Sequence, residues 1–386
     1  MTKSFVAIHD IGAFGGAERY AAFLCSALLE QNHQVTMLTK PGTSVEDIEN
    51  YYSVNLSGIQ VKPVKPIFKF LPAEISRFFT DFFRYIYLKI DRADYYFECS
   101  YKSEAFGGAK NNYYICHFPH QLTPVSLGGL RKKYFSTIKV LRNLLLGKGK
   151  GFQFSYQKIL ANSKYTQHYV LERWGVESSV LYPPCPVSNT ERAKTKKIIS
   201  IGRFSEEVSN VPHKGQHYLI EAFSASEKLI REGWELHLIG SCRTESGEKY
   251  LNQLQSLSEG LPIVFHPNAS YEQLQNLCAE AMIYWHAQGY GQNLEEHPET
   301  QEHFGITTVE AMSAGCIPIV IDSAGPKEVA ENYGGETWKT LEELRQKTIE
   351  IAALSSDELA RRQQQVRERA DYFSEDRFRA RVRNIL

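Results

Sequence analysis

The stretch that decides the fold lies within the first forty residues. "SFVAIHD" (residues 4–10) is a short β-type run, "GAERYAAFLCSALLEQNH" (16–33) has helical apolar spacing, and "QVTMLTK" (34–40) has the pattern of a second strand. These three segments form a βαβ unit, whose strands run parallel because the helix carries the chain back along the sheet. Further strands are expected at 95–99, 112–118 and 158–163. We therefore predict an α/β fold built on a parallel sheet.

The alternation of expected strands and helices is interrupted by three prolines in "LYPPCPVSNT" (181–190) and resumes after this segment. Strands are expected at 197–204, 235–240, 262–267, 282–287 and 317–321, and the tail from about residue 341 is expected to be helical, without a strand. This predicts a second doubly wound domain. The predicted division is an N-terminal domain at 1–185, a C-terminal domain at 186–365, and a C-terminal helix at 366–386 that packs back on the N-terminal domain.

Composition narrows the class of protein. A chain of 386 residues favours two domains, and 44 basic against 44 acidic residues leave no net field to attract nucleic acid, so no nucleic-acid partner is expected. The seven cysteines contain no C-x-x-C pair, which favours a reducing, cytoplasmic location. No apolar run approaches the roughly 18 residues that a membrane-spanning helix needs. Any membrane contact is therefore expected to be peripheral, on the inner face of a membrane.

Two segments have the composition of a surface contact. Residues 66–90 are rich in aromatics with interspersed cations, and residues 131–151 are both basic and apolar. Such segments suit a helix that lies at a membrane surface. The alternative is an amphipathic helix that packs on its own sheet and keeps its cations in water.

A glycine-rich loop, "DIGAFGGAERY" (10–20), lies between the first expected strand and helix. Its glycines, Gly12, Gly15 and Gly16, do not have the G-x-G-x-x-G spacing of a dinucleotide loop. Helix N-termini with glycines bind anions through backbone amides, so a loop for a phosphate or an acceptor is favoured. A tight turn without a ligand remains the alternative.

Two cations are expected at the carboxyl edge of the second sheet, where ligands bind in doubly wound folds. Arg203 ends the strand in "IGRF", and Lys214 precedes the next helix in "HKGQHYLIEAF". A bidentate guanidinium and a mobile ammonium together suit a diphosphate. The alternative is a pair of solvated surface cations. The connection between them, residues 205–212, is long and polar.

Two glutamates flank a helix start in "EHFGITTVEAMSAGCIPIVI" (302–321). Glu302 precedes the helix and Glu310 lies about one turn inside it, while the amides of Gly305, Ile306 and Thr307 are placed to bind a phosphate. Neither glutamate has an obvious basic partner nearby in the sequence, so both are expected to bind hydroxyls. The alternative is that Glu302 is exposed and Glu310 only compensates the helix dipole.

Histidines offer a weaker signal. "YYICHFPH" (113–120) places His117 and His120 just after an expected strand, where a histidine can carry a proton or bind a substrate hydroxyl. Before the resemblance below is considered, a structural role is favoured for both. The histidines of the second half, His286 among them, have no metal-ligand spacing, so no metal site and no metal cofactor are expected.

Taken together, these segments resemble the retaining glycosyltransferases of family GT4. The strongest match is "EHFGITTVEAMSAGCIPIVIDSAGPKEV" (302–329), which is similar to the E-x7-E segment of that family and the strand and glycine turn after it. "GGAER", "ANSKYT", "LYPP", "IGRF" and "HKG" match further family positions in the same order. The resemblance implies a GT-B fold, in which two Rossmann-like domains face each other across a cleft.

The resemblance also implies roles for the second half. Arg203 and Lys214 would hold the diphosphate of a nucleotide-sugar donor, Glu302 the hydroxyls of its sugar, and Glu310 its ribose. The amides that would hold a phosphate are those of Gly305, Ile306 and Thr307.

In the first half, His117 would touch the donor sugar near its reacting carbon, with His120 as a weaker candidate. Gly15 and Gly16 would face the diphosphate and the acceptor. His117, Arg203, Lys214 and Glu302 are thus the predicted catalytic residues.

The strings "CHFPH" and "EHFGI" resemble the mannosyltransferases of lipid-linked oligosaccharide assembly, which favours GDP-mannose as donor. The acceptor stays open among a glycan, a glycolipid and a small glycoside. One departure from the family pattern is an acidic insertion at 288–301, beside the expected donor site, which we interpret as a lid or a determinant of sugar choice.

The expected reaction retains the anomeric configuration by a front-face route, in which the leaving phosphate accepts the proton of the acceptor and no metal is required. The alternatives are a nucleotide-sugar epimerase of the same fold and a peripheral membrane protein that binds without catalysis.

Overall fold

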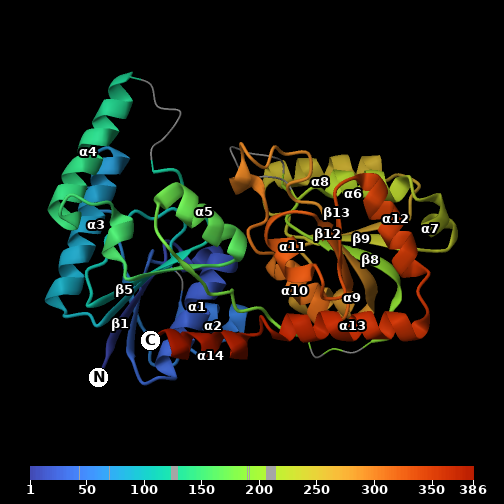
Figure 1. Ribbon diagram of the computed structural model, residues 1–386, viewed down its shortest axis with the longest axis horizontal. Helices are drawn as coiled ribbons and strands as arrows, with labels where there is room; N and C mark the ends of the chain where they lie inside the picture. Colours follow the sequence, from blue (N-terminus) through green and yellow to red (C-terminus); the bar gives the residue numbers. More distant parts are fainter. Residues whose placement is uncertain (43, 69, 123–128, 189, 191, 206–213) are drawn as a thin grey trace. The chain divides into compact units, whose positions relative to one another are not determined.

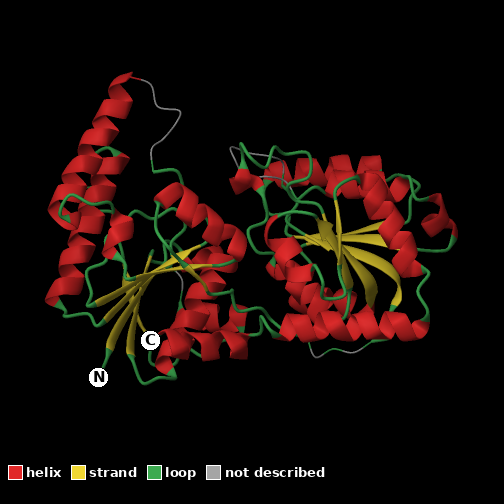
Figure 2. Ribbon diagram, viewed as in Figure 1, coloured by secondary structure: helices red, strands yellow, loops and turns green. Residues whose placement is uncertain are grey.

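A computed structural model describes the chain except residues 43, 69, 123–128, 189, 191 and 206–213. It divides into two compact units (Figure 1). The first unit comprises Met1–Pro184 with Phe378–Leu386, and the second comprises Cys185–Arg377. In each unit helices cover both faces of a strand layer (Figure 2).

The first unit holds a sheet with the strand order β3-β2-β1-β4-β5-β6-β7, and every pair is parallel. The order reverses between β1 and β4, which makes this a topological switch point. The strands are β1 (Lys3–Ala7), β2 (Gln34–Thr39), β3 (Gln60–Pro63), β4 (Tyr95–Glu98), β5 (Asn111–Cys116), β6 (Lys158–Ala161) and β7 (Ser179–Val180).

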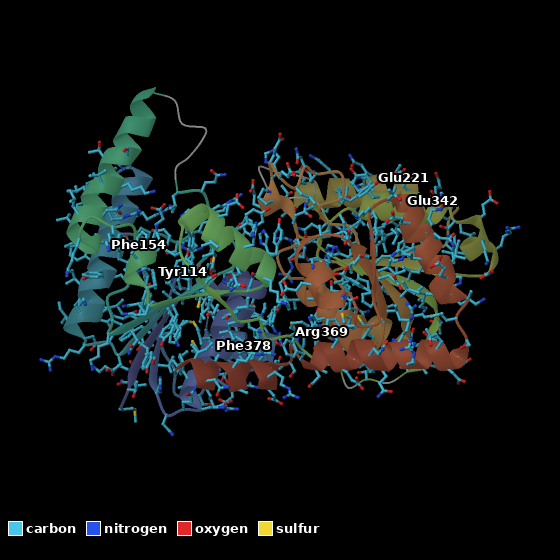
Figure 3. All side chains as sticks on the ribbon, viewed as in Figure 1. Tyr114, Phe154, Glu221, Glu342, Arg369 and Phe378 are labelled. Atoms are coloured by element: carbon cyan, nitrogen blue, oxygen red, sulfur yellow. The ribbon has the colours of Figure 1, made fainter. Side chains whose placement is uncertain are left out.

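Apolar clusters lie on both faces of this sheet, because its strands are buried on both sides. Phe378 of the last helix, labelled in Figure 3, joins one of these clusters. Its ring meets that of Tyr20 edge-on. The helices are α1 (Gly16–Leu29), α2 (Val45–Tyr52), α3 (Ala73–Ile90), α4 (Gly129–Gly147), α5 (Lys164–Trp174) and α14 (Glu375–Ile385), with 3-10 turns η1 (Ile11–Ala13) and η2 (Phe152–Ser155).

The second unit repeats the plan with the order β10-β9-β8-β11-β12-β13, again all parallel. Its switch point lies between β8 and β11. The strands are β8 (Thr195–Ile201), β9 (Glu235–Gly240), β10 (Ile263–Pro267), β11 (Ala281–His286), β12 (Ile317–Ile321) and β13 (Glu336–Trp338). The helices are α6 (Gln216–Ser224), α7 (Glu227–Arg231), α8 (Glu245–Leu257), α9 (Tyr271–Glu280), α10 (Ile306–Ser313), α11 (Ala324–Ala330), α12 (Leu341–Ala352) and α13 (Ser356–Asp371), with the 3-10 turn η3 (Pro298–Thr300).

The prediction of two parallel-sheet, Rossmann-like domains is confirmed, with differences at the edges of the sheets. The sequence pattern missed β3, β7 and β13, three edge strands of two to four residues that are too short for a clear period.

The C-terminal segment differs from the expected single helix at 366–386. Residues 366–371 finish α13 in the second unit, and the helix that joins the first unit is α14, after a break at 372–374. There, Arg379 of α14 forms an ion pair with Glu30 just after α1, with 3.0 Å between Nε and Oε1. Within the described part of the chain, no helix combines the length and the apolar character needed to cross a bilayer.

Candidate active site

The predicted donor-site residues of the second unit gather beside the switch point between β8 and β11. Arg203 follows β8 after one intervening glycine, and Lys214 lies directly before Gly215, the N-cap of α6. Glu302 lies on the loop between β11 and α10. The carboxyl ends of neighbouring parallel strands therefore bring together residues that lie up to a hundred positions apart.

The centre of this group is an ion pair. The Nζ of Lys214 lies 2.6 Å from Oε2 of Glu302, and about a quarter of each side chain is exposed. Lys214 also donates a hydrogen bond to Oε1 of Gln288. The expectation that Glu302 has no basic partner is therefore wrong, because the fold brings Lys214 to it across 88 residues.

The charges around Glu302 determine its protonation state. Burial alone would raise the pKa of its carboxyl, but the Lys214 ammonium and the neighbouring His286 outweigh burial and hold the pKa at about 2. Glu302 is therefore ionised at neutral pH. An ionised carboxylate accepts hydrogen bonds from sugar hydroxyls and repels phosphate.

Glycine places Lys214 against the end of β8. A Cβ atom on Gly202 would lie 2.7 Å from Cγ of Lys214, so the lysine stem packs directly on the glycine backbone. The next residue, Arg203, is exposed and has no carboxylate within ion-pair distance among the described residues. One cation is thus held by Glu302 and the other is available to an anion. His213, the first residue of the predicted "HKG" string, and most of the connection at 205–212 lie outside the described residues.

The start of α10 has the geometry expected of an anion site. Gly305 is its N-cap with φ of 97°, a backbone conformation that favours glycine. No described residue accepts a hydrogen bond from the amides of Gly305, Ile306 or Thr307. These amides carry the positive end of the helix dipole, and they lie directly after the loop that holds Glu302.

Side chains on α10 divide between the core and the site. The Thr307 hydroxyl lies 3.0 Å from the hydroxyl of Tyr284 on β11, so this side chain links the helix to the sheet. Glu310, predicted to bind the ribose, is half-buried on the second turn of α10. Its predicted role stays a prediction.

The glycine loop of the first unit differs from the prediction of an anion loop. The Gly15 amide donates to Oε2 of Glu18 (3.0 Å), and the Gly12 amide donates to Oδ1 of Asp10 (3.1 Å). Gly16 is the exposed first residue of α1. Two of the loop amides therefore already face carboxylates of the chain itself, as in a helix N-cap.

His117, just after β5, is held by the backbone. Its Nε2 lies 3.0 Å from the carbonyl oxygen of Cys99, and since a carbonyl can only accept, Nε2 carries the proton. Burial lowers the pKa of His117 to about 4, against the opposing effect of this hydrogen bond. His117 is therefore neutral, and its Nδ1 can accept a hydrogen bond from a sugar hydroxyl but cannot donate one.

His120 lies in a different environment. Its Nε2 is 3.3 Å from Oε1 of Glu104, which also binds Arg142, and its ring stacks on Phe152 and meets Trp174 edge-on. These contacts fix His120 within the packing of the first unit, which favours the structural role over a role in substrate binding.

The acidic insertion at 288–301 is fixed at both ends. Gln288 donates to the carbonyl of Thr300 (3.2 Å), and Gln301 donates to the carbonyl of Gly289 (3.4 Å). The middle, residues 293–297, is exposed. The predicted role as lid or sugar selector stays a prediction, but the first insertion residue, Gln288, contacts Lys214.

Sequence reasoning missed Gln288 and gave no role to His286. Gln288 has no motif that marks it, since its importance arises only from the approach of Lys214. His286 carried a usable signal, because it lies at the carboxyl end of an expected strand next to the switch point.

Comparison with known proteins assigns both halves of the chain. Residues 14–188 match the family model "Glycosyltransferase Family 4", and residues 186–370 match "Glycosyl transferases group 1". The two matches meet at the boundary between the two units.

The curated relatives include mannosyltransferases. A mouse (Mus musculus) "GDP-Man:Man(3)GlcNAc(2)-PP-Dol alpha-1,2-mannosyltransferase" is 30% identical over 62% of this chain and 52% of its own length. The Xenopus laevis protein of the same name is 32% identical over 44% of this chain and 35% of its own length. The chain thus spans about half or less of these relatives. An alpha-1,3/1,6-mannosyltransferase of Saccharomyces cerevisiae is 24% identical over 86% of this chain and 72% of its own length.

Solved structures support the fold. A glycosyltransferase from Rickettsia africae is similar with a TM-score of 0.69 at 16% identity, covering 100% of this chain and 97% of that one. Anabaena HepE, solved with UDP and glucose, has a TM-score of 0.64 at 14% identity, covering 99% of this chain and 98% of that one. At these identities the likeness concerns the GT-B fold alone.

Proposed function

Because the chain belongs to the group 1 glycosyltransferases of family 4, we propose that it transfers a sugar from a nucleotide diphosphate to an acceptor hydroxyl. The observation that carries the proposal is the Lys214–Glu302 ion pair (2.6 Å) beside the start of α10, at the switch point of the second sheet. The cations and the free amides there bind a diphosphate, and the ionised carboxylate accepts hydrogen bonds from the hydroxyls of a sugar.

The donor we propose is GDP-mannose. The support is the printed names of the curated relatives, several of which are GDP-mannose-dependent mannosyltransferases. In the structure Lys214 is paired with Glu302. On donor binding, Lys214 moves to the diphosphate beside Arg203 and the amides of α10, and Glu302 is released to the sugar hydroxyls.

The reaction proceeds with retained configuration. The bond between the anomeric carbon and the diphosphate oxygen breaks, the acceptor oxygen attacks the same face, and the leaving diphosphate takes the acceptor proton. Arg203, Lys214 and the amides of α10 stabilise the charge that grows on the leaving group. In the first unit, His117 accepts a hydrogen bond from a sugar hydroxyl through Nδ1. The proposed reaction needs no metal ion, so addition of a chelator is expected to leave the rate of transfer unchanged.

The acceptor we propose is a lipid-linked saccharide, taken from a membrane surface that the first unit contacts peripherally. Helices α3 and α4 lie side by side in this unit (Figure 1). Along α4, four aliphatic side chains are between 48% and 61% exposed, and Lys148 and Lys150 at its end are also exposed; the four are Val140, Leu141, Leu144 and Leu145. An apolar stripe beside cations suits an anionic bilayer.

Donor consumption tests the reaction directly. Purified protein is incubated with GDP-mannose or UDP-glucose, with and without a lipid-linked saccharide, and products are analysed by mass spectrometry and NMR. Transfer only in the presence of acceptor, with retained anomeric configuration, is expected. Donor turnover without acceptor would identify an epimerase, binding without turnover would identify a binding protein, and an inverted product would overturn the front-face route.

Vesicle co-sedimentation tests the membrane contact. Binding to vesicles that contain anionic lipid is expected, and Leu144→Glu with Leu145→Glu is expected to abolish it while donor turnover with a short soluble acceptor persists. Equal sedimentation of this variant and the parent would contradict the contact through α4.

A further inference from the structure

His286 is the last residue of β11, at the switch point of the second sheet. Side chains two positions apart on a strand point to the same face, so His286 shares its face with Tyr284, whose hydroxyl lies 3.0 Å from Thr307 in the first turn of α10. His286 therefore lies two residues closer than Tyr284 to the carboxyl end of β11, on the side of the sheet that carries the start of α10.

The backbone beside His286 touches the lysine loop. A Cβ atom on Gly215 would lie 2.8 Å from the carbonyl oxygen of Ala287, so the segment that carries Lys214 packs directly on the residue after His286. The charges of Glu302 and Lys214 both act on the imidazole of His286. His286 thus belongs to the same group as the ion pair.

The imidazole of His286 has an unusual property for a buried polar group. Only 5% of the residue is exposed, and neither Nδ1 nor Nε2 has a hydrogen-bond partner among the described residues. Buried polar atoms in folded proteins are nearly always hydrogen-bonded, and those that are not usually have a reason connected with function. A second histidine of this sheet shows the ordinary situation, since Nε2 of His266 lies 2.9 Å from Nδ1 of His237.

We propose that His286 is a donor-binding residue, whose ring nitrogens hydrogen-bond hydroxyls of the sugar that Glu302 holds. This inference rests on the proposed function of the site. It assigns His286 a part in sugar choice, because a site built to hydrogen-bond a hydroxyl rejects a sugar that lacks it or carries it elsewhere.

The ligand matched by His286 is a hydroxyl rather than a phosphate. Burial lowers the pKa of His286 to about 4, although Glu302 acts in the opposite direction, so the ring is neutral at pH 7. A neutral imidazole offers one donor and one acceptor, which is the complement of a hydroxyl. Phosphate oxygens only accept, and they are drawn to Arg203, Lys214 and the amides of α10.

Two substitutions separate a donor-binding histidine from a structural one. His286→Met removes both hydrogen-bonding atoms at similar volume, and His286→Gln keeps a donor and an acceptor. His266→Met, which removes a partnered histidine of the same sheet, is the matched control. For each variant, thermal unfolding of the ligand-free protein is measured, together with Kd for GDP-mannose and for GDP, or for UDP-glucose and UDP if the parent prefers them.

In His286→Met, the Tm of the ligand-free protein is expected to stay the same or rise by about 2 °C, because an unsatisfied buried group is removed. Kd for the nucleotide sugar is expected to weaken roughly tenfold, while Kd for the nucleoside diphosphate changes less than twofold. His286→Gln is expected to lie nearer to the parent. His266→Met is expected to show the reverse, a lower Tm with unchanged ligand binding.

The inference is overturned if His286→Met lowers the Tm or fails to fold, or if it binds the nucleotide sugar as the parent does. Equal weakening of the nucleotide sugar and of the nucleoside diphosphate would also overturn it, since the contact would then be to the diphosphate. If the parent itself binds no nucleotide sugar, the proposed function fails first, and the parent titration alone reveals this.

Discussion

The two units each place a glycine and a glutamate at a helix start on the carboxyl edge of a parallel sheet, but they use them differently. In the first unit, Glu18 accepts the amide hydrogen of Gly15 (3.0 Å), so the carboxylate of the helix caps its own N-terminus. In the second unit, Glu302 is bound by Lys214 (2.6 Å), and no described residue accepts from the amide of Gly305.

The difference teaches what makes a helix start an anion site. Glycine gives the backbone access in both places, but the amide of the N-cap glycine has no acceptor among the described residues only where the nearby carboxylate has another partner. Lys214 therefore has two effects in the second unit. Its ion pair engages the carboxylate of Glu302, and under the proposed function its ammonium also supplies a cation for the diphosphate.

The largest expected effect comes from removing that lysine. Lys214→Met is expected to lower kcat/KM for the donor about 100-fold or more, because it removes a charge that stabilises the leaving diphosphate. The measurement is steady-state transfer with the donor varied. Lys197→Met is the matched control, since Lys197 lies on β8 of the same unit, is about as buried as Lys214, and pairs with Glu280 at 2.7 Å. A similar loss in both variants would mean that the effect of Lys214 is structural.

Removing the glycine of α10 is expected to have the next largest effect. Gly305→Ala must adopt φ of 97°, and its Cβ would lie 3.1 Å from Oγ1 of Thr308. We expect a loss of about 1–3 kcal/mol in unfolding free energy and roughly tenfold weaker binding of the nucleoside diphosphate. Calorimetry and urea unfolding measure both quantities.

Gly260→Ala separates strain from ligand binding. Gly260 has φ of 77° and open space around its Cβ position, so it carries a comparable backbone cost without adjoining the site. It is expected to lose stability and to keep its affinity for the nucleoside diphosphate. If Gly305→Ala also keeps that affinity, the amides of α10 do not bind the diphosphate.

The sequence predicted the two sheets, the carboxyl-edge positions of Arg203 and Lys214, and the place of Glu302 before a helix start, because strand periods and the order of elements are local properties. It failed at the pairing of Lys214 with Glu302, since charges 88 residues apart carry no mark of their distance in space. It also favoured the Gly15 loop as an anion site, because a glycine pattern does not indicate which carboxylate occupies the amides.

The pH dependence of stability tests the ion pair itself. The folded pKa of Glu302, about 2, lies below its usual value of 4.5, so the pairing stabilises the fold fully above about pH 4.5 and this contribution is lost as pH falls toward 2. Glu302→Gln is expected to lower the unfolding free energy by about 2 kcal/mol at pH 7. In urea unfolding, the difference from the parent should be constant from pH 8 to 5.5 and narrow below pH 4.5.

The lysine variant provides the control for this dependence. In a Lys214→Met background the Glu302 carboxyl has lost the ammonium. The difference in unfolding free energy between Lys214→Met and the double variant with Glu302→Gln is therefore not expected to narrow below pH 4.5. The same narrowing in both backgrounds would mean that another group, and not Lys214, holds the pKa of Glu302 low.

The smallest expected effect concerns the cap of the first unit. Glu18→Ala removes the acceptor of the Gly15 amide and is expected to lower the unfolding free energy by about 1 kcal/mol, whereas Glu18→Gln keeps an acceptor and should cost less. Both variants are expected to bind the nucleotide-sugar donor as the parent does, measured by calorimetry. If the loop at Gly15 binds the diphosphate, removing the negative charge of Glu18 would instead tighten donor binding more than twofold in both variants, and the contrast between the two helix starts would disappear.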